Sequence, residues 1–249
     1  MEGGLYRFQG TSANNYICFG TSTKSTCTGN TDAYMYRILG INSSGQLKLI
    51  KKEALNTAYY WHNTDLNNTT WPNSDLYKGI NGISGGQYSN LFIGNTTYVS
   101  STWSGKIATT TWKYGTNVQE GTSASSLYEK ENAWSTTTSA KIGLLYLHEY
   151  YYGISGGNNC SSSSYSSSCK SSWLHLSNND SDNLYSAEWT MSGYGYVNGG
   201  FSAYVIGSNG RISTSNMHYS SSVRPVFFLT SDVSYVSGTG TLADPIIIN

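Results

Sequence analysis

Four cysteines have the spacing that points most directly to covalent chemistry. They form two pairs, Cys18/Cys27 and Cys160/Cys169, and eight residues separate the members of each pair. The intervening segments are polar and cannot pack a core, so a disulfide would close each into a defined loop. Four cysteines allow three connectivities, and the two local pairs are the most economical. Zinc is the alternative, but structural zinc sites use a shorter cysteine spacing or added histidines. We therefore predict two disulfides and an oxidising, extracytoplasmic compartment.

Acid–base chemistry would have to come from four scattered histidines, of which only His148 has an adjacent carboxylate, Glu149. Neighbouring side chains of a strand point to opposite faces, so these two are not expected to act together. We interpret the histidines as structural and predict no catalytic residues. A Ser–His–Asp arrangement among the many serines stays open.

The run at residues 178–183 is rich in side-chain oxygens, including those of Asp180 and Asp182. Calcium takes about six to eight oxygen ligands, so this run could supply several. It lacks the glycine and glutamate spacing of an EF-hand loop. We favour a loop built on Asx turns, keep calcium as the alternative, and predict no other cofactor.

The late part of the chain concentrates side chains that suit a binding surface. Tyr and Trp give large contact area at low entropic cost, and Ser, Asn and Gly give adaptable hydrogen bonds. We predict that these residues contact a ligand: Trp189, Tyr194, Tyr196, Asn198, Tyr204, Asn209, Arg211, Asn216, His218 and Tyr219. The competing interpretation is that Trp189 and Tyr204 are core residues and the others belong to solvated loops.

Arg224 lies in an otherwise apolar segment at residues 223–229. A buried guanidinium needs a carboxylate or carbonyl groups as partners. We interpret Arg224 as structural, with Glu188 as its candidate partner.

The composition excludes several classes of partner. The chain has 249 residues, 14% aromatic and 11% charged, with a formal net charge of zero. No basic surface is expected, so we predict that the chain does not bind nucleic acid. No run of about 18 apolar residues occurs, so we predict no direct membrane insertion. The first four residues lack the basic and apolar regions of a signal peptide. We expect an export signal or anchor upstream, in an N-terminal segment missing from this chain.

Alternating apolar positions and turn residues predict a mostly β protein. Residues 34–41 and 46–52 read as a hairpin around the turn at 42–45. Residues 75–81 have helical spacing and Ser74 as a candidate N-cap, and residues 87–93 are predicted to be a second short helix.

The later segments add strands and long polar loops. The apolar run at residues 141–152 is predicted to be the strongest strand, and the Ser-rich run at 155–172 a surface loop. Further strands are expected at residues 16–19, 173–176, 184–191, 201–206, 210–215 and 223–229. The fold class is therefore α+β, mostly antiparallel β with two short helices and long irregular loops. One domain is expected over 16–249, with a linker or leading segment at 1–15 and a C-terminal hairpin at 232–249.

Six motifs in a fixed order carry a resemblance to a known family: YRILG at 36–40, WPNSDL at 71–76, KIGLL at 141–145, EWTMS at 188–192, VRPVFFL at 223–229 and SGTGTLADPI at 237–246. The chain resembles bacterial domains of the C-type-lectin-like superfold, in the branch of formylglycine-generating-enzyme-like domains and the variable proteins of diversity-generating retroelements. It is most similar to Firmicutes surface or pilin-like proteins. The resemblance implies a compact α+β domain whose late half displays a ligand-binding face. The cysteine pattern of the formylglycine-generating enzymes and the Glu-Pro-Asn or Gln-Pro-Asp triplets of calcium-dependent lectins are not found here, so neither activity carries over.

Composition and resemblance together lead to one functional hypothesis. We expect a noncatalytic, extracellular, cell-surface domain of adhesin or receptor type that binds a protein or glycan on another cell or a host surface. Diversification of its sequence by a retroelement belongs to this hypothesis. The alternatives are a structural pilin-like subunit without a ligand, and an enzyme of the formylglycine-generating-like fold with an unrecognised site.

Overall fold

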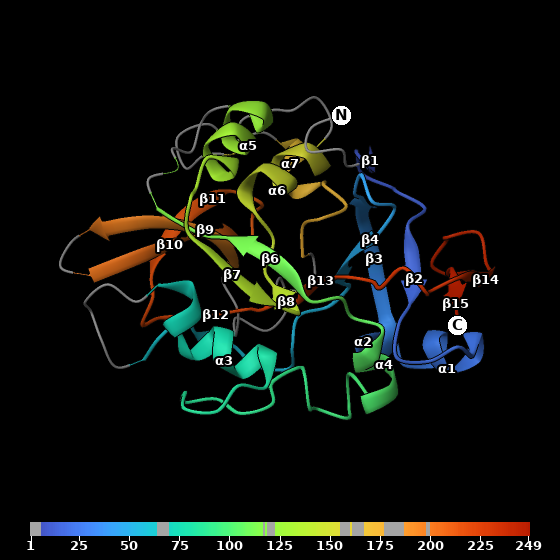
Figure 1. Ribbon diagram of the computed structural model, residues 1–249. Coiled ribbons are helices and arrows are strands. Elements are labelled where there is room, and N and C mark those ends of the chain that lie inside the picture. Colours follow the sequence, from blue (N-terminus) through green and yellow to red (C-terminus); the bar gives the residue numbers. More distant parts are fainter. Residues whose placement is uncertain are drawn as a thin grey trace.

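The computed structural model describes residues 6–63, 70–116, 118, 123–154, 160, 167–176, 187–197 and 200–249. It is an α+β structure in which all paired strands of the described sheets run antiparallel, as predicted (Figure 1). The strands are β1 (Tyr6–Arg7), β2 (Tyr16–Cys18), β3 (Met35–Ile41), β4 (Leu47–Lys51), β5 (Tyr59–Tyr60), β6 (Thr110–Lys113), β7 (Thr137–Ala140), β8 (Ile142–Gly143), β9 (Ala187–Val197), β10 (Gly200–Gly207), β11 (Ile212–Asn216), β12 (Ser220–Ser221), β13 (Val226–Phe228), β14 (Tyr235–Ser237) and β15 (Ile247–Ile248). The helices are α1 (Lys24–Gly29), α2 (Thr31–Tyr34), the 3₁₀ helix η1 (Trp71–Asn73), α3 (Asp75–Asn81), α4 (Ser101–Gly105), α5 (Ala124–Asn132), α6 (Leu147–Gly153) and α7 (Ser167–Lys170).

The largest sheet has the strand order β1-β3-β4-β13-β8, and β2 also pairs with β3. The predicted hairpin at its centre is confirmed by the register of β3 and β4, from Tyr36↔Lys51 to Ile41↔Leu47. Its turn is stabilised by the Asn42 side-chain oxygen, which accepts hydrogen bonds from two backbone N–H groups at 2.8 and 3.1 Å. The alternating apolar residues and the turn at Asn42 therefore both specify the hairpin at the centre of the sheet.

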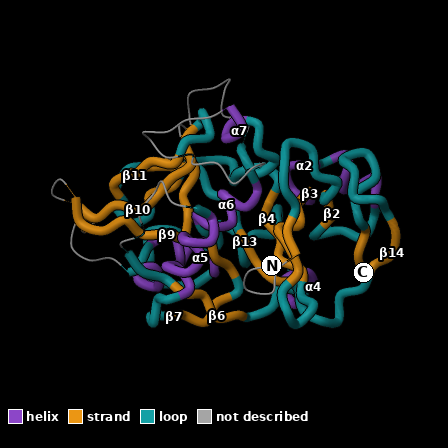
Figure 2. The backbone as a smooth tube through the Cα atoms, turned by 90° about the horizontal axis from the view of Figure 1, so that it is seen from above, coloured by secondary structure: helices purple, strands orange, loops and turns teal. Residues whose placement is uncertain are grey.

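A second sheet, in the order β11-β10-β9, projects from the body at the left of Figure 1. Its long strand β9 contains register shifts: Gly193 and Gly195 pair with the consecutive residues Ala203 and Ser202, so Tyr194 is an extra residue. Such β-bulges bend a strand and re-aim its side chains. Viewed from above, α5 and α6 lie against the base of this sheet (Figure 2).

The described residues contain more helices than the two that the sequence predicts. Helix α3 is confirmed, with the Ser74 side chain accepting a hydrogen bond from the Tyr77 N–H at 3.0 Å and Gly82 ending the helix at a φ of 66°. Residues 87–93 are not helical, contrary to the prediction, because the Leu91 N–H donates to the Gly79 carbonyl at 2.8 Å and folds the segment back on α3.

The predicted strand at residues 141–152 is also wrong in its second half. Only Ile142–Gly143 pairs as β8, and the chain becomes helix α6 at Leu147. Two carboxylates explain the change: Glu149 accepts the Tyr146 N–H at 3.1 Å and Glu131 accepts the Leu147 N–H at 3.2 Å. They satisfy N–H groups at the start of the helix that have no partner within it. Residues 173–176, also predicted to be a strand, form turns.

Aromatic side chains fill the core between these elements. Phe19 packs against Tyr36 of β3 and Phe227 of β13, and the ring centroids of the three lie 4.8 to 5.5 Å apart. Trp61 packs between Trp71 and Trp189, at 4.8 and 5.7 Å. The high aromatic content therefore serves the interior as well as the surface.

Both predicted disulfides are present, Cys18–Cys27 and Cys160–Cys169, with Cα–Cα distances of 5.9 and 5.8 Å. Disulfides are typical of proteins in oxidising compartments. In the part of the chain that is described, no helix has the length and apolar character needed to cross a membrane.

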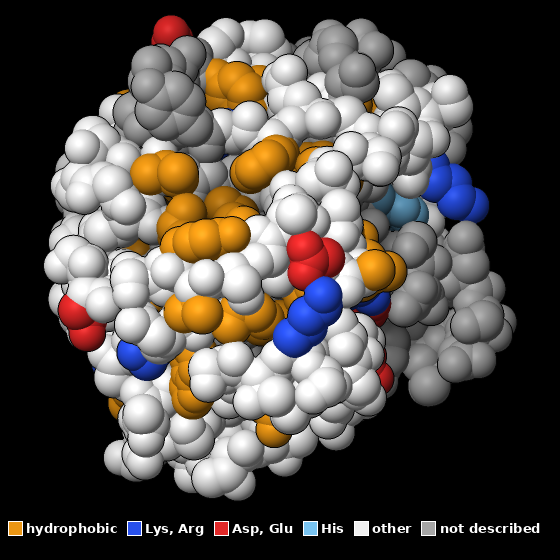
Figure 3. All heavy atoms as spheres, turned by 90° about the vertical axis from the view of Figure 1, so that its right-hand side faces the viewer, with side chains coloured by type: hydrophobic (Ala, Val, Ile, Leu, Met, Phe, Trp, Pro, Cys, Tyr) orange, Lys and Arg blue, Asp and Glu red, His pale blue; other side chains and the backbone are white. Residues whose placement is uncertain are grey.

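The two ends of the described chain pack on the main sheet. Within the predicted leading segment, β1 pairs with the end of β3, and the fully buried Asn15 donates to the Ile38 carbonyl at 2.8 Å. At the other end, β14 and β15 pair, and the Ile246 N–H donates to the Tyr16 carbonyl at 2.9 Å. Figure 3 shows the side of the molecule that lies at the right of Figure 1, where apolar side chains gather with few charges between them. Tyr235 on β14 is 65% exposed.

Candidate functional site

Two of the predicted ligand contacts belong to the core. Trp189 and Tyr204 are 1% and 0% exposed. The Trp189 indole N–H donates to the Tyr59 carbonyl at 2.8 Å, and the Tyr204 hydroxyl donates to the Val118 carbonyl at 2.6 Å. This placement corrects the expectation for both residues and agrees with the competing interpretation. They anchor the β9–β11 sheet to the rest of the domain.

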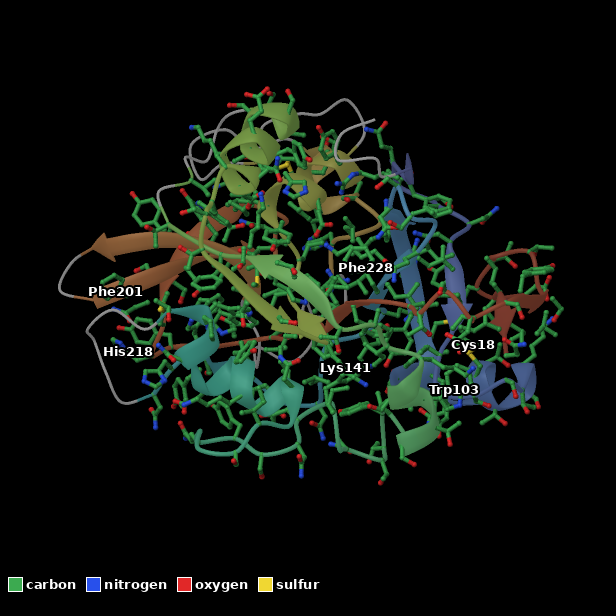
Figure 4. The ribbon with its side chains drawn as sticks, in the orientation of Figure 1. Cys18, Trp103, Lys141, Phe201, His218 and Phe228 are labelled. Atoms are coloured by element: carbon green, nitrogen blue, oxygen red, sulfur yellow. A yellow bond between two sulfur atoms is a disulfide. The ribbon has the colours of Figure 1, made fainter. Side chains whose placement is uncertain are left out.

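Three other predicted residues lie together where β11 ends. The Asn216 side-chain oxygen accepts the His218 N–H at 3.3 Å, and the Tyr219 N–H donates to the Asn216 carbonyl at 2.9 Å. The His218 and Tyr219 rings lie 4.6 Å apart, and Tyr219 is 60% exposed. Phe201, half-buried on β10, lies at the same end of the sheet, because the Met217 N–H donates to its carbonyl at 3.0 Å (Figure 4). We call Phe201, Asn216, His218 and Tyr219 the aromatic edge.

Other predicted contacts lie elsewhere on the same sheet. Asn209 and Arg211 occupy the turn at its opposite end, where the Arg211 N–H donates to the Asn209 side chain at 3.0 Å. Tyr194 is half-buried and packs edge-on against Tyr204 at 5.3 Å. Tyr196 differs from these, because its backbone pairs with Phe201 and so lies beside the aromatic edge. The predicted surface is therefore not one patch.

Three of the predicted residues cannot be placed. Asn198 and the calcium candidates Asp180 and Asp182 lie outside the described residues. Among the residues that are described, no group of three or more His, Cys, Asp or Glu side chains is arranged to hold a metal ion.

A cavity of about 300 Å³, which the sequence does not predict, lies between the main sheet and helices α5 and α6. Lys48 enters it from β4, and its ammonium group lies 5.1 to 5.3 Å from the ring centroids of Trp112, Tyr146 and Phe228. Its Nζ donates to Glu149 Oε1 at 2.6 Å. Cation–π contacts and a direct ion pair therefore hold a fully buried amine in place.

Glu131, from α5, forms a second buried cluster beside the same cavity. Its carboxylate accepts hydrogen bonds from the backbone N–H groups of Leu147 and His148, both at 3.2 Å. It also contacts His148 Nδ1 at 2.5 Å and accepts a hydrogen bond from the Ser192 hydroxyl. A carboxylate that orients an imidazole is a common acid–base arrangement. Here the same carboxylate also holds the start of α6.

Charge and burial shift the titration of this region in opposite directions. Burial raises the pKa of Glu149, but Lys48, His148 and Arg7 outweigh it and hold that pKa at about 2. Burial lowers the pKa of Lys48, and Glu149 opposes this. Burial also raises the pKa of the Tyr146 hydroxyl well above its ordinary value. Glu149 is therefore a permanent anion at neutral pH, bound to the cations around it.

The sequence gives only part of this network. Glu149 stands three residues after Tyr146, which is the spacing of the carboxylate half of a capping box, but Tyr146 replaces the usual Ser or Thr, so the full sequence motif for the start of α6 is absent. Glu131 lies 17 residues before His148, and their contact depends on the packing of α5 against α6. The prediction that Glu188 is the partner of Arg224 is confirmed. The Arg224 guanidinium donates two hydrogen bonds to the Glu188 carboxylate, each 2.8 Å long.

Comparison with known proteins returned no match: no family model, no curated protein and no solved structure is significantly similar to this chain.

Proposed function

We propose that this chain is a noncatalytic, extracellular ligand-binding domain with a C-type-lectin-like fold, and that its aromatic edge contacts the ligand. The observation that carries the proposal is the exposed Tyr219 ring, which contacts the His218 ring at a tilted angle at the end of a projecting sheet. The ligand is a protein or glycan on the surface of another cell or a host.

Rigidity of the supporting sheet favours this assignment. Trp189 and Tyr204 bury large rings and satisfy their polar groups at the base of the sheet. Asn216 fixes the backbone that presents His218 and Tyr219. A binding group held in advance loses less entropy when the ligand arrives.

Binding is favoured over catalysis because the acidic groups beside the cavity already have structural partners. Glu131 binds two backbone N–H groups, His148 and Ser192. Glu149 binds Lys48 and the Tyr146 N–H. If Glu131 or Glu149 acted as a general base, it would have to exchange these hydrogen bonds for contacts with a substrate. The N–H groups at the start of α6 would then lose their acceptors.

The family and location are part of the same proposal. An antiparallel α+β architecture with local disulfides fits a C-type-lectin-like surface protein. A purely structural pilin-like subunit would need no exposed tyrosine such as Tyr219 at the end of a projecting sheet.

Arrays of glycans and of extracellular proteins, probed with the purified chain, test the proposal. We expect the parent chain to bind one or more ligands on the arrays. A His218→Ala/Tyr219→Ala variant should lose most of its binding to the same ligands. The matched control is Tyr235→Ala, which removes an equally exposed tyrosine on β14. Equal loss in the control, or unchanged binding by the double variant, would contradict the assignment of the aromatic edge.

A further inference from the structure

A second cavity, of about 310 Å³, lies where β2 and the ends of β3 and β4 meet the segment at residues 170–176. Small-molecule sites start at about 300 Å³, so it has room for one small ligand. Four cationic side chains line it, Arg37, Lys52, Lys170 and Arg224, against one carboxylate, Glu53. The cavity is separate from the aromatic edge and shares no residue with it.

Arg37 carries most of the argument because it is a buried cation with neutral partners. It is 7% exposed and donates to the Asn15 side chain at 2.6 Å and to the carbonyls of Ala13 and Trp173 at 3.1 and 3.4 Å. The rings of Tyr16 and Trp173 lie 4.0 and 4.7 Å from its guanidinium carbon. Burial lowers its pKa to about 10, so the group is still charged at neutral pH.

The carboxylates nearby are committed to other cations. Glu188 binds Arg224 through both of its oxygens. Glu53 contacts the adjacent Lys52. A buried charge without a counter-charge is unfavourable, and an anion in the cavity would remove that cost for Arg37.

His175 is an independent sign that the cavity receives a polar ligand. It lines the cavity and is 7% exposed, and neither ring nitrogen has a hydrogen-bond partner among the described residues. Burial and then Arg224 lower its pKa; the backbone of Gly207 and Ser208 acts in the opposite direction without a hydrogen bond of normal geometry. A neutral imidazole can donate one hydrogen bond and accept one. Within the described part of the chain, the His175 ring can therefore offer a nitrogen to an oxygen of the ligand.

We propose that this cavity binds a small oxyanion, held between Arg37 and Lys52 and hydrogen-bonded by His175. Arg37 uses three of its five N–H groups on Asn15, Ala13 and Trp173, and the other two can donate to the oxygens of a carboxylate or a sulfate, which are the groups that acidic sugars carry. The same chemistry would accept free inorganic sulfate. The binding experiment distinguishes these two sources.

Calorimetric titration of the full chain at constant ionic strength, with sodium glucuronate, glucose and sodium sulfate, tests this assignment. We expect glucuronate to bind with a Kd below about 10 mM and to compete with sulfate, whereas glucose does not bind. Sulfate binding without glucuronate binding would support the oxyanion site with the inorganic ion as its source. Failure of both anions to bind, or equal binding of glucose and glucuronate, would overturn the proposal.

Variants place the anion in the cavity. Lys52→Gln and His175→Leu are expected to weaken binding about tenfold, as for loss of a hydrogen bond to a charged group. The control Lys78→Gln removes a cation on α3 whose Nζ donates to the Gly85 carbonyl, and it should bind as the parent does. Arg37→Lys keeps the charge but loses the fork; where it fails to fold, the first two variants decide. Unchanged affinity in both of them would refute the site, whatever the outcome at the aromatic edge.

Discussion

Glu149→Gln is the substitution that most directly tests the buried network beside α6. The Glu149 carboxylate lies 2.6 Å from the Lys48 ammonium and accepts the Tyr146 N–H at 3.1 Å. The Lys48 ammonium donates to Oε1 and the Tyr146 N–H to Oε2, so glutamine, with a single oxygen, can accept one of the two hydrogen bonds and carries no negative charge. The variant therefore resembles the protonated form of the carboxyl group, which is also neutral and also has only one carbonyl oxygen.

The pKa of Glu149 gives the magnitude. A fall from the ordinary value of 4.5 to about 2 corresponds to about 3 kcal/mol of folding free energy. Removing one member of a buried ion pair typically costs ~3–5 kcal/mol, which agrees. Because the folded pKa is the lower one, this stabilisation is complete above about pH 5. It shrinks to roughly 1 kcal/mol at pH 3 and is lost as the pH falls through 2.

Urea unfolding at pH 7 and pH 3, followed by tryptophan fluorescence, measures the prediction. The Glu149→Gln variant should be about 3 kcal/mol less stable than the parent at pH 7 and about 1 kcal/mol less stable at pH 3. Adding Lys48→Met should restore part of the loss at pH 7, because no unpaired buried cation remains. A difference that stays constant between the two pH values would refute the assignment of the anion to Glu149.

Two further predictions concern the scaffold. Tyr204→Phe removes the hydroxyl that donates to Val118, so we expect a loss of ~1–3 kcal/mol in urea unfolding, and no loss would mean that this bond is not formed. Cys18→Ala/Cys27→Ala opens a loop whose ends are nine positions apart, and the chain-entropy relation gives a loss of about 2–3 kcal/mol. Thermal unfolding should show a lower Tm under non-reducing conditions, and an unchanged Tm would contradict a stabilising role for this disulfide.

Local signals predicted the elements that local chemistry forms. The hairpin of β3 and β4 follows from alternation and the turn at Asn42, and α3 follows from Ser74 at its N-cap. The disulfides follow from cysteine spacing, and the Arg224–Glu188 pair follows from the need of a buried cation for an anion.

Long-range packing decided what the sequence did not predict. The apolar run after Ile142 fits a strand or a buried helix equally well, and Glu131 from another helix selects the helix. Trp189 and Tyr204 have the residue types of a binding surface, but their side chains face the core. Neither cavity is visible in the sequence, because each is lined by residues from elements far apart in the chain.

The two disulfides also determine how the domain responds to mechanical force. Each joins cysteines only nine positions apart, so each shortens the fully extended chain by only about 25 Å, at ~3.4 Å per residue. Neither disulfide links one strand of the main sheet to another strand of that sheet. When the two ends of the chain are pulled apart, resistance comes from strand-to-strand hydrogen bonds and packed aromatic rings, and nearly the whole polypeptide can extend once these yield.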